Sequence, residues 1–346
     1  MEKECRAPPP PARSSTRVRW CVRALLSPFA LLLPTACGGV QSALDPAGTQ
    51  AELIATLFWI MAAGAVLVWL GVIAFAIYAT LVDPGRHSVR ISRRIIIGGG
   101  VVLPVIVLTA LLVPGLALLP ELRSKPADDG LKVEVSGEQW WWRVTYRPVD
   151  GAPVTMANEV RLPFGETVEF VLTSPDVIHS FWIPALAGKV DMTPGRMTRL
   201  VVTPNRTGIF RGACAEYCGE SHARMSFHAV VMPPDEFARW LKHQRADAAA
   251  PANDDARRGQ RAFLSNGCGA CHTIRGTRAN GTVGPDLTHV GSRLALAAAT
   301  LPNDTDAFRR FIAHANAVKP AARMPRFDML PHEDIEAIAH YLDGLE

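Results

Sequence analysis

Four side chains that bind transition metals lie close together between residues 214 and 225. Cys214 and Cys218 are four residues apart, His222 follows four residues later, and Met225 follows three residues after that. Thiolates and thioethers favour copper(I), and imidazole binds copper in either oxidation state. No cluster of carboxylates accompanies them, which argues against a calcium or magnesium site. The spacing predicts a copper site, and two cysteines this close can bridge two copper ions.

A site with two copper ions needs a second imidazole, and His179 is the candidate. It lies in the segment 174–182, after an apolar strand-like run and before a turn that contains proline. Two alternatives remain open at this point: a disulfide between Cys214 and Cys218, or a zinc site of two cysteines and two histidines. A zinc site gives no role to Met225, and a disulfide explains neither histidine.

A second motif reads Cys268-Gly-Ala-Cys-His272. Cys-x-x-Cys-His is the attachment signature of a c-type haem, in which Cys268 and Cys271 form thioether bonds and His272 lies under the iron. A thioredoxin-like redox pair is the alternative, but no strand-helix-strand pattern surrounds the motif. Met324, which precedes a proline as in small cytochromes c, is the candidate sixth ligand, because methionine raises the haem potential. Met329 is the local competitor, and core packing is the alternative role for either methionine.

Composition bounds the remaining possibilities. The chain has 346 residues, enough for two or three domains, and its net charge of +4 is small. It contains no basic helix and no interleaving of aromatic with basic residues, so nothing supports binding to nucleic acid. Of the seven cysteines, four belong to the two motifs, Cys5 and Cys21 lie in a leader, and Cys37 ends that leader. No structural disulfide is required.

Residues 1–36 have the features of a targeting segment. A basic, proline-rich start precedes the apolar run 24–33, which is too short to span a bilayer comfortably. Thr35-Ala-Cys37 resembles the end of a bacterial lipoprotein signal, with Cys37 as the lipidated first residue, although Pro34 stands where leucine is usual. Ordinary cleavage nearby and an uncleaved anchor are the alternatives. The leader predicts export.

Two long apolar blocks, 53–82 and 95–119, each exceed the roughly 20 residues that a membrane-spanning helix needs. The loop 83–94 between them carries four arginines against one acid: Arg86, Arg90, Arg93 and Arg94 against Asp83. By the positive-inside rule this loop is cytoplasmic. Everything after about residue 120 therefore faces the periplasm.

From residue 131 the pattern changes to short segments with β-branched residues at every second position. These segments are 132–135, 159–162, 167–172, 199–202 and 226–231. Period-two alternation predicts an antiparallel β-sandwich of cupredoxin type. Such a rigid scaffold suits electron transfer, because loops held by a sheet can keep a metal's ligands fixed.

The copper motif resembles a known family. Cys-x-Glu-x-Cys-x-x-x-His-x-x-Met, preceded by Asp-Val-x-His-Ser, is similar to the binuclear copper (CuA) centre of cytochrome c oxidase subunit II, over residues from about 41 to about 241. The resemblance implies bridging thiolates, terminal imidazoles, a weak axial thioether and a backbone carbonyl ligand: Cys214 and Cys218, His179 and His222, Met225, and Glu216. It also implies that the Glu216 carboxylate reaches a magnesium ion at the boundary with subunit I.

Other positions carry roles by the same resemblance. Trp140, the first ring of Gln139-Trp-Trp-Trp142, matches the surface contact through which electrons enter from a cytochrome c. Packing in the core or at the membrane interface is the alternative for each ring, and alternation on a strand leaves at least one ring exposed or facing a neighbour. Asp191 and Arg196 match positions that brace the copper loop. The acidic residue common early in the second membrane helix is absent from 95–104, which puts a proton-entry role in doubt.

The C-terminal part also resembles small cytochromes c. Gly284-Pro-Asp-Leu287 is similar to the loop that covers the haem and orients its proximal imidazole. The other histidines of this region are expected at solvent-facing or helix-face positions: His289, His314, His332 and His340. A final amphipathic helix from about residue 333 closes a compact α-helical module.

The predicted fold is a two-helix transmembrane hairpin, a cupredoxin-like antiparallel β-sandwich and an all-α class I cytochrome c domain. The predicted segments are the signal (1–36), a periplasmic N-terminal segment (37–52), membrane helices (53–82 and 95–119) with their cytoplasmic loop (83–94), the CuA domain (131–241), a flexible linker (242–255) and the cytochrome c domain (256–346).

The resemblance implies subunit II of a respiratory cytochrome c oxidase, multi-pass in the bacterial inner membrane, with haem c and CuA on the periplasmic side. Electrons would come from a cytochrome c or another periplasmic donor and pass through haem c and CuA to the haem and CuB of subunit I. Oxygen reduction and proton translocation would belong to that subunit, with subunit III as a further partner. A nitrous or nitric oxide reductase and a copper carrier are the alternatives.

Overall fold

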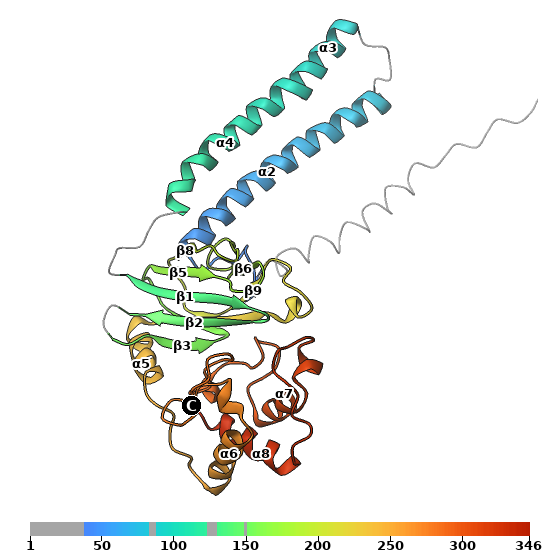
Figure 1. Ribbon diagram of the computed structural model, residues 1–346. Coiled ribbons are helices and arrows are strands. Elements are labelled where there is room, and N and C mark those ends of the chain that lie inside the picture. Colours follow the sequence, from blue (N-terminus) through green and yellow to red (C-terminus); the bar gives the residue numbers. More distant parts are fainter. Residues whose placement is uncertain (1–37, 83–87, 123–129, 149–150) are drawn as a thin grey trace, which may run out of the picture.

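The computed structural model describes residues 38–82, 88–122, 130–148 and 151–346 (Figure 1). It contains a pair of long apolar helices, a β-sandwich and a helical C-terminal domain, as the sequence predicts. The leader and Cys37, with its predicted lipid, lie outside the described residues, and so do Asp83 and Arg86 of the predicted cytoplasmic loop.

The two apolar helices extend from one end of the sandwich (Figure 1). The first is α2 (Thr49–Ile77), continued by a π-helical turn, η1 (Tyr78–Val82); the second is α3 (Val89–Ile97), η2 (Gly98–Val102) and α4 (Leu103–Leu122). They give spans of 33 and 32 residues with mean hydropathies of 2.5 and 2.7. Beyond the first turns of α2, where Ala51 and Ala55 are buried, their apolar side chains are exposed, which is unfavourable in water and fits a lipid environment.

The second helix begins earlier than predicted. Its first residue is Val89 rather than residue 95, and the Ser88 hydroxyl caps it by accepting the backbone N–H of Ile91 at 3.3 Å. Arg90, Arg93 and Arg94 therefore lie in the first turns of a helix and not in a loop.

The sandwich consists of two five-stranded sheets. One has the order β3 (Val154–Ala157), β2 (Trp141–Arg147), β1 (Leu131–Glu138), β5 (Val168–Thr173), β8 (Thr198–Val202), and the other β4 (Glu159–Pro163), β10 (Ser226–Met232), β9 (Gly208–Cys214), β6 (His179–Trp182), β7 (Val190–Met192). Side chains alternate between buried and partly exposed along β1 and β2, so one face of their sheet packs on the second sheet.

All five predicted strands are present, but the sandwich is not purely antiparallel. Strand β1 pairs with β5 in parallel, and β10 pairs with β4 in parallel. Of the other five strands, β2 was expected only from the alternation of its tryptophans, and the remaining four were not predicted. They include the short edge strand β7 and strand β9, whose glycines and cysteine weaken the period-two pattern.

An aromatic cluster fills the sandwich core near β6 and β10. The rings of Phe181 and Phe227 stack with centroids 4.9 Å apart, and Trp142 meets Phe227 edge-on at 5.3 Å. All three side chains are fully buried. Rings in such contact stabilise the core beyond their buried area.

The N-terminal segment is part of the sandwich rather than a free lead-in. The backbone N–H of Ala47 donates to Ala185 O at 2.6 Å, and that of Thr49, the first residue of α2, donates to Thr203 O at 3.1 Å. The first membrane helix therefore starts directly from a hydrogen-bonded edge of the sandwich.

The C-terminal domain is helical. Its elements are α6 (Asp254–Ser265), η4 (Cys268–Ala270), η5 (Val290–Ser292), α7 (Thr305–Val318) and α8 (His332–Asp343), and α5 (Pro234–Gln244) packs on the sandwich before them. The predicted flexible linker lies against this domain, because the Arg275 guanidinium donates to Gln244 O and Ala246 O at 2.5 and 3.1 Å.

His289 corrects another expectation. It is buried and not at a solvent-facing or helix-face position, and its ring nitrogens lie 2.8 Å from Glu346 O and 3.1 Å from Ala246 O. The side chains of His314 and His340 are about half exposed, as predicted, and His332 is exposed at the start of α8.

Candidate metal centres

The predicted copper ligands come from three neighbouring elements at one end of the second sheet. His179 is the first residue of β6, Cys214 is the last residue of β9, and Met225 directly precedes β10. Because β9 pairs with both β6 and β10, these three positions are adjacent in space. Cys218 and His222 lie in the loop between β9 and β10.

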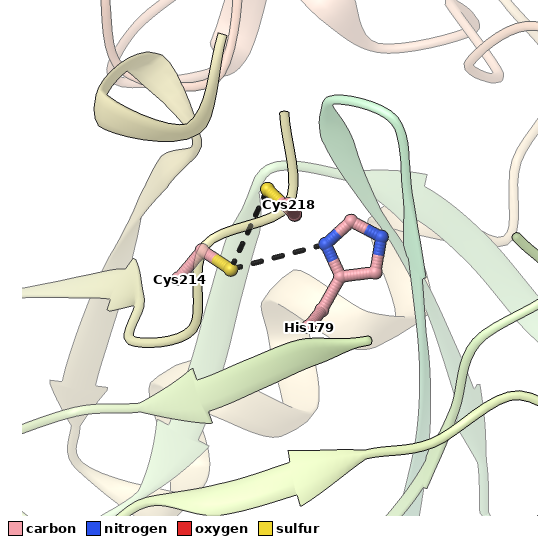
Figure 2. A group of neighbouring side chains, drawn as sticks. All are labelled: His179, Cys214 and Cys218. Atoms are coloured by element: carbon pink, nitrogen blue, oxygen red, sulfur yellow. Dashed lines mark hydrogen bonds between the residues drawn. The ribbon is translucent and has the colours of Figure 1, made fainter. Parts of the chain in front are cut away.

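The ligand atoms converge. The Sγ atoms of Cys214 and Cys218 are 3.8 Å apart, and Cys214 Sγ lies 3.8 Å from Nδ1 of His179 (Figure 2). Cys218 Sγ lies 3.6 Å from Nδ1 of His222 and 3.8 Å from Sδ of Met225. Each sulfur of the central pair therefore has its own imidazole, which is the arrangement that two bridged ions need.

The chemistry of this set fits copper. A disulfide would hold its sulfurs at about 2.05 Å, so the two thiols are separate. A zinc ion could take the two thiols and two imidazoles. It would leave unexplained the Met225 thioether, which is 1% exposed and faces Cys218.

The two thiols have opposite acidities. The hydrogen bond from Cys218 lowers the pKa of Cys214 to about 4, with help from His179 and against the effect of burial. The pKa of Cys218 is raised by the same bond and by burial. The pair therefore holds one negative charge readily, which suits ligands that must be deprotonated to bind a metal.

Asp176 fixes the orientation of His179. Its Oδ1 lies 2.9 Å from Nε2 of His179, so this nitrogen carries the proton and Nδ1 is left to face Cys214. Burial acts to lower the pKa of His179, but its bonds to Cys214 and Asp176 raise it overall. Gly137 on β1 completes the support, because a Cβ there would lie 3.0 Å from the His179 ring.

Glu216 presents its backbone oxygen and its carboxylate to different neighbours. Its backbone oxygen lies 3.1 Å from Cys214 Sγ, so the carbonyl faces the cluster. Its carboxylate is 44% exposed and lies 3.8 Å from the ammonium of Lys189. Among the described residues, the group of potential metal ligands within 4.8 Å of one another contains His179, Cys214 and Cys218 but no carboxylate.

The two predicted bracing residues differ. Asp191 on β7 accepts a hydrogen bond from the Ser180 hydroxyl at 2.7 Å, next to His179, and so ties β7 to the ligand-bearing strand. Arg196 lies in the turn before β8, where its backbone N–H donates to Thr193 O at 3.0 Å, and its side chain is exposed.

The tryptophans occupy three different environments. Trp142 is fully buried in the core, and Trp141 lies under the Arg143 guanidinium at 4.6 Å. Trp140 lies in the turn between β1 and β2, and its indole N–H donates to Cys218 O at 3.0 Å. Its expected place at an open surface is wrong for this conformation: only 7% is exposed, and the C-terminal domain lies against it.

The second motif forms a compact turn after α6. The backbone N–H of His272 donates to Cys268 O at 3.0 Å, which keeps both cysteines and the imidazole on one short segment. Nδ1 of His272 lies 2.8 Å from Pro285 O, so the loop predicted to orient this imidazole does contact it. Gly284 lies so close that a Cβ would be 2.6 Å from the ring.

The pKa of His272 and the exposure of the two nearby methionines bear on which residues could bind a haem iron. Burial lowers the pKa of His272, which favours the neutral imidazole that binds iron. Met324 is partly buried against the core of this domain, whereas its competitor Met329 is 70% exposed. These positions suit a haem held by Cys268, Cys271 and His272, with Met324 rather than Met329 as the sixth ligand.

Comparisons with known proteins match both parts of the chain to families. Residues 149–232 match the family "Cytochrome C oxidase subunit II, periplasmic domain", and residues 256–346 match "Cytochrome c". A protein named cytochrome c oxidase subunit 2 from Alkalihalophilus pseudofirmus is 32% identical over 334 residues, which is 92% of this chain and 95% of the relative.

Two further relatives have related names. A cytochrome c oxidase subunit 2 from Bacillus sp. strain PS3 is 29% identical over 76% of this chain and 75% of its own length. The crystal structure of the periplasmic domain of subunit II of cytochrome oxidase from Bradyrhizobium japonicum is 29% identical, covers 35% of this chain and 97% of its own, and has a TM-score of 0.33.

Proposed function

The chain belongs to the cytochrome c oxidase subunit II family, and from this premise we propose that it carries electrons through a covalent haem c and a binuclear CuA centre to subunit I. As part of a haem-copper oxidase it acts in electron transport at a membrane. The observation that supports the proposal most is the buried cluster of His179, Cys214 and Cys218 with Met225, in a chain that also contains Cys-x-x-Cys-His.

Copper bound here would supply reversible one-electron chemistry. Cys214 and Cys218 would hold it as thiolates, and His179, His222, Met225 and the Glu216 carbonyl would be the further ligands. The burial of His179 and both thiols excludes water, and the β-strands keep the ligands in place. A ligand shell that barely moves between oxidation states suits fast electron transfer.

Trp140 is proposed as the residue through which electrons enter the copper site. Its indole N–H is bonded to Cys218 O, so the ring is one hydrogen bond away from a ligand. Haem c, held by Cys268, Cys271, His272 and Met324, would donate from the C-terminal domain.

Partners and topology follow from the same proposal. The chain is multi-pass in the bacterial inner membrane, with a cytoplasmic loop near residues 83–94 and both metal domains in the periplasm. Subunit I, with its haem and CuB, and subunit III are its partners, and a periplasmic cytochrome c is its donor. The partly exposed carboxylate of Glu216 is available to a magnesium ion at the boundary with subunit I, where it would have to exchange its Lys189 contact.

The test is a spectrum of the purified, assembled oxidase together with its oxygen uptake from reduced cytochrome c. We expect a c-type haem spectrum, a near-infrared band, and a spin-resonance signal of one unpaired electron shared by two copper ions. A complex with a mononuclear copper signal, or one that reduces nitrous or nitric oxide but not oxygen, would overturn the proposal.

A further inference from the structure

One short loop of the C-terminal domain, residues 318–324, lies against the copper domain (residues 131–241) next to the candidate copper ligands. Two side chains of the copper domain donate hydrogen bonds to this loop: the hydroxyl of Ser221 to Pro320 O at 2.7 Å, and the guanidinium of Arg224 to Val318 O. Ser221 and Arg224 flank the copper ligand His222 in the sequence. The segment 318–324 ends at Met324, the candidate haem ligand. It therefore contacts residues next to the copper site and also contains a candidate ligand of the haem site.

Lys319 is the centre of this contact. It is only 4% exposed, although it is a lysine, and its ammonium group donates to Trp140 O at 2.5 Å, Arg224 O at 2.8 Å and Ala297 O at 3.4 Å. An ammonium group has three N–H bonds, so these three carbonyl oxygens satisfy it completely. Two of the acceptors belong to the copper domain and one to the haem-binding domain.

A buried charge is retained only where its hydrogen bonds are made. Burial lowers the pKa of Lys319 to about 7. Removing the lysine would take a donor from three carbonyl oxygens between the domains, of which, among the described residues, only Arg224 O would keep another, the Thr300 hydroxyl at 3.4 Å. The contact is therefore specific for a residue of this shape and hydrogen-bonding capacity.

Two more contacts show that the docking is built on both sides. The buried carboxylate of Glu159, on β4, accepts the backbone N–H of Leu294 at 2.8 Å, and the backbone N–H of Ser226 donates to Ala298 O at 3.3 Å. Residues 297–299 are three consecutive alanines with φ between 52° and 58°, a left-handed conformation that persists only where the surroundings hold it. The bonds from Lys319 and Ser226 hold it here.

We propose that Lys319 is a positioning residue that fixes the haem-binding domain over Trp140, so that electrons reach the copper site from the tethered domain and not from a soluble cytochrome docked on the copper domain. The proposal rests on the proposed function. A soluble cytochrome would therefore deliver its electron to the haem-binding domain and not to copper directly, because Trp140 is covered while that domain is docked.

The test uses Lys319→Met in the assembled oxidase, with Lys242→Met as the matched control. Methionine has a similar length but cannot donate hydrogen bonds, and Lys242 is an exposed lysine on α5. The first measurement is hydrogen exchange at the backbone amides of Ser226 and Leu294, which are bonded across the interface and report docking whatever the metals do. The second is the rate at which copper is reduced after haem c in rapid mixing with a reduced soluble cytochrome.

We expect Lys319→Met to speed exchange of both amides by about tenfold or more, as the loss of several buried hydrogen bonds implies. It should also slow reduction of copper by haem c and add a phase in which the soluble cytochrome reduces copper directly. The haem and copper spectra should not change, and Lys242→Met should match the unaltered protein. Lys319→Arg, which keeps the charge but places its donors on a larger, planar group, should recover only part of the protection.

Wild-type exchange and rates in Lys319→Met would overturn the proposal. So would fast exchange of both amides in the unaltered oxidase, a result that does not depend on whether any variant folds. Should the methionine variant fail to assemble, Lys319→Gln is judged by the same two measurements. A missing two-copper signal in the unaltered protein would instead refute the proposed function, so the two failures are distinguishable.

Discussion

Asp176→Asn should weaken copper binding by roughly 10- to 100-fold, the usual effect of losing a partner that orients a metal-binding histidine. Both carboxylate oxygens of Asp176 accept hydrogen bonds: Oδ1 from Nε2 of His179 at 2.9 Å and from the Val177 backbone at 2.7 Å, and Oδ2 from the Gln139 backbone at 2.8 Å. Asparagine has the same shape but only one acceptor oxygen. In either orientation its NH₂ group therefore faces another donor.

The size of the effect follows from that mismatch. An unpaired buried donor costs about 1–3 kcal/mol, and tenfold in affinity corresponds to about 1.4 kcal/mol, so both estimates give one to two powers of ten. The assay is competition with a copper chelator, followed through the near-infrared band of the oxidase. Asp235→Asn, at an exposed aspartate on α5, is the control and should not change the titration. Equal copper retention in Asp176→Asn and the control would refute the assignment of Asp176 as the orienting residue.

Three further predictions concern other parts of the chain. Trp140→Gln should slow copper reduction in rapid mixing and leave the copper spectrum unchanged; unaltered kinetics would remove Trp140 from the electron path. Gly212→Ala should lower the thermal midpoint by several degrees, since its Cβ would fall within the buried ring of Phe227 and overpacking costs about 1–3 kcal/mol, whereas Gly38→Ala, with open space around it, should not. Burial lowers the pKa of His228 from 6.5, so the unfolded chain binds its proton first as the pH falls; stability should therefore fall below pH 6.5 down to the lowered pKa. His228→Gln should flatten this fall of the thermal midpoint with decreasing pH. An unchanged dependence on pH in the variant would contradict the attribution of the fall to His228.

The sequence was most informative where ligands are close together along the chain. Cys214 to Met225 could be recognised as a candidate metal site from their spacing, because one short segment contains four potential ligands, and the haem motif is equally local. Five of the strands could be predicted from their period-two pattern and the two long helices from the length of their apolar runs, but β6 and β9, which carry His179 and Cys214, were not predicted.

Contacts between distant segments could not be predicted in the same way. Asp176 lies three residues before His179, but its role depends on the turn at Gln139, which is far away in the sequence. Lys319 reads as an ordinary surface lysine until the two domains are placed together. His289 was assigned wrongly for the same reason, because the residues that bury it are the linker and the C-terminus.

The join between α2 and the sandwich limits how the copper domain can move. Thr49 is both the first helical residue and a hydrogen-bond donor to Thr203 O, so no slack chain separates the bilayer from the β-strands on this side. A change in membrane thickness that tilts the helix would tilt the sandwich with it, and the distance of His179 and its neighbours from the lipid surface would follow the bilayer. Lipid composition would then act on the geometry of electron delivery to subunit I.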